Sequence, residues 1–381
     1  MANGGGRSGG ANRTKRMRAG TRSRPEAWLA RRGGWIELLR IPAALYGGAV
    51  ALRHFLYDRG WLSSHRLEVP VISVGNLSAG GTGKTPFVAW LGAWLDERGR
   101  RPGILSRGYR GTSRGRDRES DETRWLKRAL PLVPLQVGPD RVAGAARLIE
   151  QGVDCIVLDD GFQHRRLRRD LELVLVDATR PFGLPRGEAG DLGVRAFLPR
   201  GLLRDSPLRL ARCDAIVVTR ADQVSPAELD DLVDRLRSLA PGPGILRGVH
   251  RPLRLVAPDG RASHAAALRG RDVDLVSGIG NPQAFQATVQ KLGGRIGEHR
   301  AFPDHHAYAP GDLDGLGTEG RWIVTTAKDA EKLAALERPV HVLEIEFQLE
   351  QGTGLLEALL DALPNGRRRM GRAAIHEGLH G

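Results

Sequence analysis

The chain has 381 residues, which is enough for two domains and a sizeable buried core. Its two cysteines, Cys155 and Cys213, exclude a disulfide framework and give no metal-ligand spacing, so the composition favours a reducing cytoplasm. The formal net charge of +14 suits an anionic surface or substrate. Nucleic acid is not expected as a partner, because the arginines are not interleaved with aromatic residues and no nucleic-acid-binding motif is visible.

The N-terminal residues divide into a basic arm, 1–34, and an apolar segment, 35–62. The composition of the arm predicts disorder. The longest charge-free run of the apolar segment, 41–52, has twelve residues, whereas a bilayer-spanning helix needs about twenty. The segment also starts too late, and lacks the cleavage site, for a signal peptide. It predicts an amphipathic helix resting on a membrane surface, and a helix packed on the domain core is the alternative.

A glycine-rich turn follows the apolar run at 71–74 and precedes a helix-like stretch, 87–95. This strand, loop and helix order is typical of a phosphate-binding P-loop, in which backbone N–H groups and a helix N-terminus face an anion. Lys84 would reach the β- and γ-phosphates of a nucleotide, and the Thr85 hydroxyl would help to hold Mg²⁺. The strict motif fails only at its first position. The predicted nucleotide-binding residues are Ser78, Ala79, Gly80, Gly81, Thr82, Gly83, Lys84 and Thr85.

Further apolar runs alternate with helical patterns along the chain, which predicts an α/β fold with a mostly parallel, P-loop NTPase-like sheet flanked by helices. Functional residues then belong at the carboxyl ends of the strands. A Pro-, Gly- and Arg-rich stretch suggests a linker before a smaller C-terminal α/β domain. The expected boundaries are a kinase core at 63–240, a linker at 241–265, the smaller domain at 266–350, and a C-terminal helix with a basic tail at 351–381.

Acidic residues and histidines supply candidate catalytic groups. Asp159 and Asp160 end a buried-strand pattern in the manner of a Walker B element, where a carboxylate usually binds Mg²⁺, although an aspartate capping the next turn would look the same. Asp121-Glu122 alone would pass as a solvated pair. The segment 302–306 could bind metal, form a catalytic dyad or be an ordinary loop. Two hydroxyls and a lysine within 325–329, at a predicted helix start, suit an anionic group.

Taken together, these segments resemble the tetraacyldisaccharide 4′-kinase family over about residues 39–347. The family transfers the γ-phosphate of ATP to the 4′-hydroxyl of an acylated, 1-phosphorylated glucosamine disaccharide, a step of lipid A biosynthesis that yields lipid IVA. It works at the cytoplasmic face of the bacterial inner membrane. The resemblance therefore implies ATP and Mg²⁺ as cofactors, and the anionic lipid substrate and inner-membrane phospholipid as partners. The segments that match the family are 71–77, 80–86, 106–109, 158–164, 197–199, 203–204, 277–282, 302–305 and 325–329.

The resemblance also implies roles for individual residues. Asp121 matches the family's catalytic aspartate, and His305 matches the histidine that partners it, so domain closure is expected to assemble the site. Lys84 and Mg²⁺ would offset charge on the phosphoryl oxygens. The implied metal ligands are Thr85, Asp159 and Glu122. The implied substrate-binding residues are Asn76, Arg107, Gln163, His164 and Arg204.

One departure from the family pattern concerns the base, because the segment around Asp121 reads Ser-Asp-Glu-Thr rather than Gly-Asp-Glu-Pro. If Asp121 does not fill that position, Asp160 becomes the candidate base. Two other functions fit a P-loop protein with this composition: a regulatory NTPase, and a membrane-surface protein that binds nucleotide without catalysis. Many regulatory or metal-delivery NTPases carry a lysine immediately before the two glycines of this loop, where this chain has Ala79.

Overall fold

The structure is a computed structural model that describes residues 28–108, 120–187 and 191–364. The expected disorder of the basic arm therefore concerns residues that lie mostly outside the described part. The same holds for the arginine-rich segment before Ser120 and for the basic tail.

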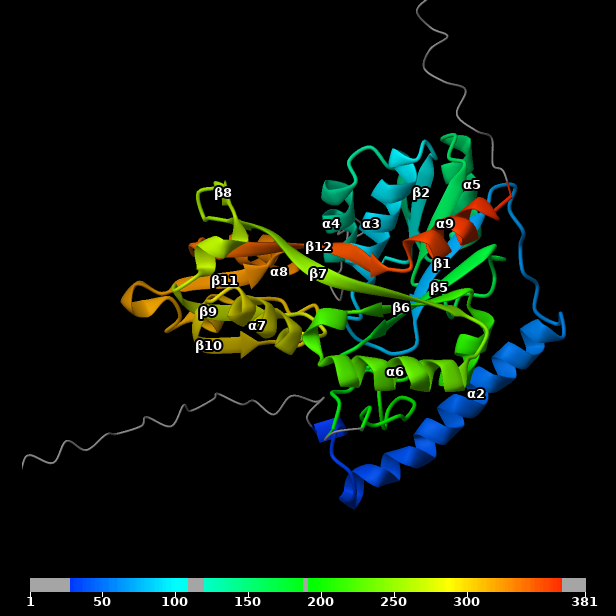
Figure 1. The fold of residues 1–381 in the computed structure, drawn as a ribbon, viewed down its shortest axis with the longest axis horizontal. Helices are drawn as coiled ribbons and strands as arrows, with labels where there is room; N and C mark the ends of the chain where they lie inside the picture. The colour runs from blue at the N-terminus through cyan, green and yellow to red at the C-terminus, as the bar shows by residue number, and fades with distance from the viewer. Residues whose placement is uncertain (1–27, 109–119, 188–190, 365–381) are drawn as a thin grey trace, which may run out of the picture.

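Twelve strands form one continuous sheet across the described part of the chain (Figure 1). Its order is β10-β9-β11-β12-β7-β6-β5-β1-β4-β2-β3, with β8 beside β7. Neighbouring strands are parallel, except that β7 runs antiparallel to both β12 and β8. The bounds are β1 Val71–Asn76, β2 Pro102–Ser106, β3 Leu135–Val137, β4 Cys155–Asp159, β5 Leu171–Asp177, β6 Ala215–Thr219, β7 Gly244–Val256, β8 Ala262–Ser263, β9 Asp272–Ser277, β10 Arg295–Ala301, β11 Trp322–Thr326 and β12 Val340–Gln351.

Helices cover both faces of the sheet, which explains why β1, β4, β5 and β6 are apolar runs buried along their whole length. Phe87 of α3 and Leu356 of α9 pack on one face, and Leu232 of α6 packs on the other. The α-helices are α2 Arg40–Asp58, α3 Lys84–Glu97, α4 Asp121–Ala129, α5 Arg141–Glu150, α6 Pro226–Leu239, α7 Pro282–Lys291, α8 Ala327–Ala334 and α9 Thr353–Asp361. The 3₁₀-helices are η1 Gly34–Leu39, η2 Pro207–Arg212, η3 Ala221–Gln223, η4 Ala265–Leu268, η5 Pro310–Leu313 and η6 Thr318–Gly320.

The sheet has two halves. The P-loop half consists of β1–β6 with α3–α6, and the C-terminal half consists of β9–β11 with α7 and α8 (Figure 1). The long strands β7 and β12 pair along ten residues of β7 and connect the halves. The prediction of a linker at 241–265 was therefore wrong. Pro252 fits within β7 because the pairing register shifts opposite it, which relaxes the need for its missing N–H.

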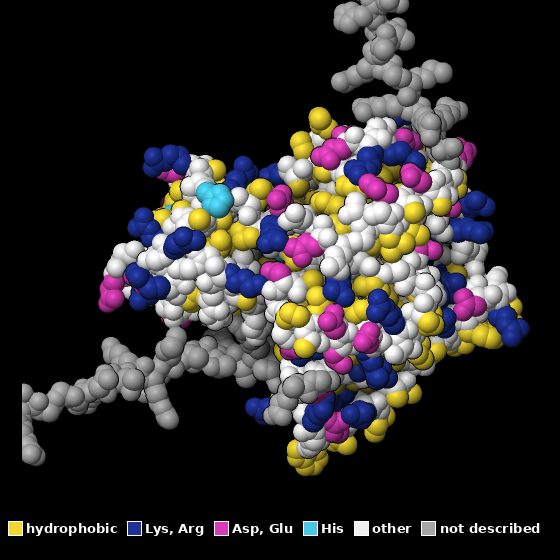
Figure 2. Space-filling model, viewed as in Figure 1, with side chains coloured by type: hydrophobic (Ala, Val, Ile, Leu, Met, Phe, Trp, Pro, Cys, Tyr) yellow, Lys and Arg dark blue, Asp and Glu magenta, His cyan; other side chains and the backbone are white. Residues whose placement is uncertain are grey.

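Helix α2 lies along the outside of the P-loop half (Figure 1). One side of it is docked: His54 is buried and its Nε2 lies 2.8 Å from a carboxylate oxygen of Asp205. Arg53 also donates a 2.8 Å hydrogen bond to the Gln163 carbonyl. The other side is apolar and open, and Figure 2 shows hydrophobic side chains along this edge. Its exposed residues, with those of flanking turns, are Trp35, Leu38, Ile41, Leu45, Leu52, Phe55 and Trp61.

Candidate active site

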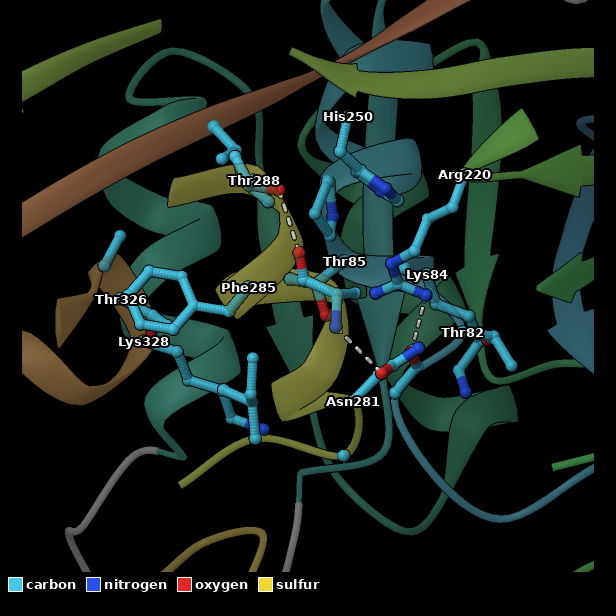
Figure 3. Close-up of a pocket in the computed structure, with 18 of the residues that line it drawn as sticks. Thr82, Lys84, Thr85, Arg220, His250, Asn281, Phe285, Thr288, Thr326 and Lys328 are labelled. Atoms are coloured by element: carbon cyan, nitrogen blue, oxygen red, sulfur yellow. Dashed lines mark hydrogen bonds between the residues drawn. The ribbon is translucent and has the colours of Figure 1, made fainter. Parts of the chain in front are cut away.

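The predicted phosphate-binding loop joins β1 to α3 at the carboxyl edge of the sheet. Gly83 caps α3 with a left-handed φ of 86°, a conformation that favours glycine, and Lys84 is the first residue of the helix. The first N–H groups of a helix have no partner within it, and Lys84 and Thr85 at the start of α3 line the cavity shown in Figure 3. Gly80 to Thr85 line that cavity, whereas Ser78 and Ala79 line a larger adjoining cleft.

Lys84 belongs to a polar network beneath the loop. Its Nζ lies 2.9 Å from Asn76 Oδ1 and 3.4 Å from Asp160 Oδ1. Arg204 donates to both carboxylate oxygens of Asp160, at 2.7 and 3.0 Å, and also to Asn76. Burial alone would raise the pKa of Asp160, but Lys84 and Arg204 hold it well below its usual range. Asp160 is therefore an ionised partner of two cations.

Asp159 has the opposite electrostatic environment. It ends β4, and its Oδ2 accepts a 3.0 Å hydrogen bond from Ser106, while its buried Oδ1 has no hydrogen-bond partner within the described part of the chain. Burial, together with the nearby charges of Glu122 and Asp160, raises the pKa of Asp159 to about 6. A buried carboxylate oxygen without a partner beside a phosphate-binding loop has the donor chemistry that a hard divalent cation prefers.

The structure brings Asp121 and His305 together, although they come from different halves. Asp121 begins α4, after a Ser120 N-cap, and His305 lies on the loop after β10 with a left-handed φ of 63°. His305 Nδ1 is 3.7 Å from Asp121 Oδ2. Burial would raise the pKa of Asp121, but His305, Lys332 and Arg124 lower it well below its usual range. Asp121 is thus not a solvated surface residue.

The remaining predicted substrate residues divide into two groups. Arg107 and Arg204 line the large cleft between the halves, together with Lys84, Asp159 and His305. Gln163 and His164 line neither of these two cavities. The Gln163 amide donates a 2.9 Å hydrogen bond to the Asn76 carbonyl. Burial and the surrounding arginines lower the pKa of His164 to about 4, so it is neutral at pH 7.

Sequence reasoning missed a group of residues that fasten the P-loop to its surroundings. Arg220 donates a 3.1 Å hydrogen bond to the Gly81 carbonyl and is also paired with Asp177. Asn281 donates to the same carboxylate at 2.9 Å. Gly280 packs so closely on Gly81 that a Cβ at either position would be crowded by the other's backbone. Nothing local in the segment 277–282 indicates these contacts, because they connect residues far apart in the chain.

His250 was also missed, because it lies in the stretch interpreted as a linker. It is buried on β7, where its ring faces Gly83 and lines the cavity in Figure 3. Among the described residues, no side-chain or backbone group forms a hydrogen bond with either ring nitrogen. Burial, and then the Arg220 charge, lower the pKa of His250 to about 3, so the ring is neutral.

The parallel sheet, the loop at its carboxyl edge and the carboxylates of β4 define a P-loop phosphotransferase. A family model described as tetraacyldisaccharide-1-P 4′-kinase matches residues 35–364. The chain belongs to the tetraacyldisaccharide 4′-kinase family, as the resemblance in its sequence indicated.

Known relatives agree with this assignment over most of the chain. A tetraacyldisaccharide 4′-kinase of Anaeromyxobacter dehalogenans is 39% identical over 89% of this chain and 93% of its own length. One from Alkalilimnicola ehrlichii is 42% identical over 82% of this chain and 88% of its own. The crystal structure of LpxK from Aquifex aeolicus in complex with ATP is 30% identical, with a TM-score of 0.63 over 86% of this chain and 99% of that one.

The family membership confirms the predicted fold class and the predicted activity. The protein is an ATP-dependent lipid kinase that phosphorylates the 4′-hydroxyl of tetraacyldisaccharide 1-phosphate, a step of lipid A biosynthesis. These comparisons do not favour a regulatory NTPase or a non-catalytic nucleotide-binding protein.

Proposed function

We propose that Asp121 accepts the proton of the 4′-hydroxyl while the P-loop holds the γ-phosphoryl group of ATP in the cleft between the halves. One observation carries this proposal: Lys84, Thr85, Glu122 and His305 line the same cleft, although they come from both halves of the sheet. The acceptor oxygen would form a bond to the γ-phosphorus as the bond to the β-phosphate oxygen breaks, and ADP would leave. Lys84 would neutralise charge on the transferred group.

His305 would orient Asp121 and help it to take the proton, since a histidine beside a carboxyl group can share that proton. The distance of 3.7 Å between His305 Nδ1 and Asp121 Oδ2 is longer than a hydrogen bond, so a small movement of the halves would bring them together. Asp160 is the alternative base, but its carboxylate already pairs with Lys84 and Arg204, the two cations that this proposal assigns to the phosphate and to the acceptor.

Thr85, Asp159 and Glu122 are the residues that would hold Mg²⁺. The partnerless buried Oδ1 of Asp159 and the hard oxygen donors of all three fit that ion. The described residues contain no group of three or more His, Cys, Asp or Glu that could hold a metal ion by itself. Mg²⁺, when bound, supplies positive charge to the phosphate oxygens.

The anionic acceptor would meet Arg107 and Arg204 in the cleft. Asn76 would fix Lys84 and Arg204 through its amide oxygen, to which both side chains donate. Gln163 and His164 would support these residues without lining the cleft, and Gln163 would do so through its hydrogen bond to the Asn76 carbonyl. Because His164 is neutral at pH 7, it would contribute a hydrogen bond rather than a charge.

The decisive experiment measures transfer of ³²P from γ-labelled ATP to tetraacyldisaccharide 1-phosphate in detergent micelles with Mg²⁺. Asp121→Asn should reduce kcat by a factor of about 100 to 10,000, because a general base typically contributes that much. Asp234→Asn is a matched control, since Asp234 also pairs with an arginine three residues further along its helix, at 3.4 Å, but on the exposed α6. Equal rates for Asp121→Asn and wild type would move the base elsewhere.

We also propose that α2 rests on the cytoplasmic face of the inner membrane rather than crossing it. By length and composition, Gly34–Asp58 could cross a membrane, and only 11% of its most apolar window is buried, which alone is weak support for either state. The buried His54–Asp205 pair, with the Arg53 bond to Gln163, fastens one side of α2 to the P-loop half. A helix held sideways in this way presents its apolar side as a surface.

Flotation with vesicles of phosphatidylethanolamine and phosphatidylglycerol tests the membrane proposal. The double variant Ile41→Glu/Leu45→Glu should stay with the soluble fraction while wild type floats with the vesicles. Leu132→Glu is the control, because Leu132 is 90% exposed in the turn after α4, away from α2. Flotation of the double variant at the wild-type level would exclude α2 as the contact surface.

A further inference from the structure

Helix α8 turns three charged side chains toward α4 of the other half. Lys328, Glu331 and Lys332 are spaced i, i+3 and i+4, so they share one face of the helix. Their partners on α4 have complementary charges, since the first turn of α4 is acidic and later positions are basic. The two helices therefore meet through ion pairs.

Lys332 makes the shortest contact with the proposed base. Its Nζ lies 2.5 Å from Asp121 Oδ2, the oxygen that His305 also faces at 3.7 Å. The two side chains are largely buried, with 16% of Lys332 and 12% of Asp121 exposed. Arg124 holds the other oxygen, Oδ1, at 2.8 Å. The Asp121 carboxylate is thus fixed from both halves at once.

Lys328 bridges the neighbours of both proposed catalytic residues. Its Nζ lies 3.3 Å from Glu122 and 2.8 Å from Asp304, which adjoin Asp121 and His305 respectively. One ammonium group therefore sets the spacing between the start of α4 and the loop after β10.

A second layer of contacts lies behind these two lysines. Glu331 forms ion pairs with Arg124 at 2.6 Å and with Arg128 at 2.7 Å. Arg124 touches both Asp121 and Glu331, so it links the two layers. Pairs that are partly buried and joined in a network hold geometry better than isolated surface pairs do.

We propose that Lys328 and Lys332 are positioning residues, which hold the α4 end that carries Asp121 against the loop that carries His305. This inference rests on the proposed roles of Asp121 and His305, and it adds the residues that align them. Without Lys332, Asp121 loses its closest partner from the opposite half. Without Lys328, the loop of His305 loses its bridge to α4. Because reacting groups need placement within a fraction of an ångström, the loss should fall on the chemical step.

The test compares Lys328→Met and Lys332→Met with Lys291→Met in the ³²P transfer assay. Methionine keeps the length and apolar stem of lysine, and thermal unfolding checks that each variant folds. Lys291 is the matched control, because it pairs at 2.9 Å with Asp222 and so also bridges the two halves, but it touches neither Asp121 nor His305. Lys332→Arg and Lys328→Arg, which keep the charge, are the conservative rescue variants.

We expect each of the two methionine variants to lower kcat at least about tenfold, with the KM for ATP changing less than about threefold. Lys291→Met should stay within about twofold of wild type, and the arginine variants should recover most of the lost kcat. Equal losses in all three methionine variants would mean that any bridging cation matters, which overturns the proposal. A raised KM for ATP with unchanged kcat would instead make Lys328 a nucleotide-binding residue, and it too would overturn the proposal for that residue.

A distance measurement separates this inference from the proposed function. Spin labels at Ser238→Cys on α6 and Glu319→Cys on η6 report the separation of the halves, and the two native cysteines are buried. We expect Lys328→Met and Lys332→Met to broaden the distance distribution, and Lys291→Met to leave it narrow. If Asp121→Asn retains activity, the proposed base is wrong. If Asp121→Asn is inactive but the two lysine variants match wild type in rate and distance, only the positioning role is wrong.

Discussion

The two halves of the molecule contribute to the cleft in different ways. In the P-loop half, Lys84 and Asp159 lie at the carboxyl edge of the sheet, where hydrogen bonds with Asn76 and Ser106 fix them. Asp160 follows Asp159, and Arg204 holds both its carboxylate oxygens. The C-terminal half instead offers His305 on an irregular loop, held through charged contacts. The phosphate site is thus formed within one half of the sheet. The proposed proton-accepting pair, in contrast, forms only when the two halves are in contact.

This difference indicates where the structure tolerates change. A parallel sheet with buried strands holds side chains at its carboxyl edge within narrow limits. The boundary between the halves is joined by ion pairs, and separating these should cost less free energy than disrupting the buried sheet. Water can solvate each charged group as a pair opens. The four predictions below test this contrast, from the largest expected effect to the smallest.

Replacing Lys84 by Met should have the largest effect, because it removes a cation from the preassembled phosphate site. We expect the rate of phosphoryl transfer to fall about 1,000-fold, as is common when one charged group of such a site is lost. The ³²P assay measures the rate, and isothermal titration measures ATP affinity. A loss below about tenfold would show that the phosphate site depends on Lys84 far less than its contacts suggest.

Replacing His305 by Gln should have a smaller effect, between about tenfold and 100-fold in kcat, because Asp121 would retain Lys332 and Arg124. Glutamine keeps a polar group of similar length at the left-handed position. His306→Gln is the neighbouring control, since His306 is tied to Asp312 at 2.8 Å and not to Asp121. A greater loss for His306→Gln would place the functional histidine one residue later.

His250 lies between the halves and should make stability depend on pH. Its pKa is about 3 in the folded chain, against an ordinary 6.5, so between these values the unfolded chain binds the extra proton. Stability is therefore unaffected above pH 6.5 and falls progressively as the pH drops toward 3. The penalty at pH 5 should be about 2 kcal/mol. Urea unfolding at pH 7 and pH 5 should show this loss in wild type, beyond any loss in His250→Gln, and equal losses would refute the assignment.

The smallest effect is expected at the outer bridge between the halves. Lys291 is 52% and Asp222 30% exposed, so water and salt screen their attraction. Asp222→Asn should change the free energy of unfolding by less than about 1 kcal/mol, as measured by urea denaturation. A larger loss would mean that exposed bridges also hold the halves together, which would weaken the contrast between α8 and the rest of the boundary.

The sequence predicted the parts of the site that follow from local pattern. Lys84 could be placed because a glycine-rich turn leads from an apolar run to a helical pattern, and Asp159 because it ends an apolar run. Parallel strands bring such ends together at one edge of the sheet. The pairing of Asp121 with His305 came only from the family resemblance, since nothing local connects residues so far apart in the chain.

Other parts could not be predicted, for identifiable physical reasons. Strand β7 was taken for a linker because Pro252 and Gly248 are unfavourable in strands, and only its pairing with β12 compensates for them. Arg220 gave no signal, because its bond to the Gly81 carbonyl depends on tertiary packing. Lys332 resembles any lysine on an amphipathic helix until α4 lies opposite it.

The docking of α2 has a consequence for how the enzyme meets its acceptor. Tyr46 of α2 lies 3.3 Å from the carbonyl of Arg204, the residue whose side chain holds Asp160. With α2 at a bilayer surface, as proposed, the cleft would be kept at a constant height above the lipid plane. Encounter with the acylated disaccharide would then be a two-dimensional search among lipids, in which the acyl chains remain in the bilayer and only the sugar headgroup rises to the catalytic groups.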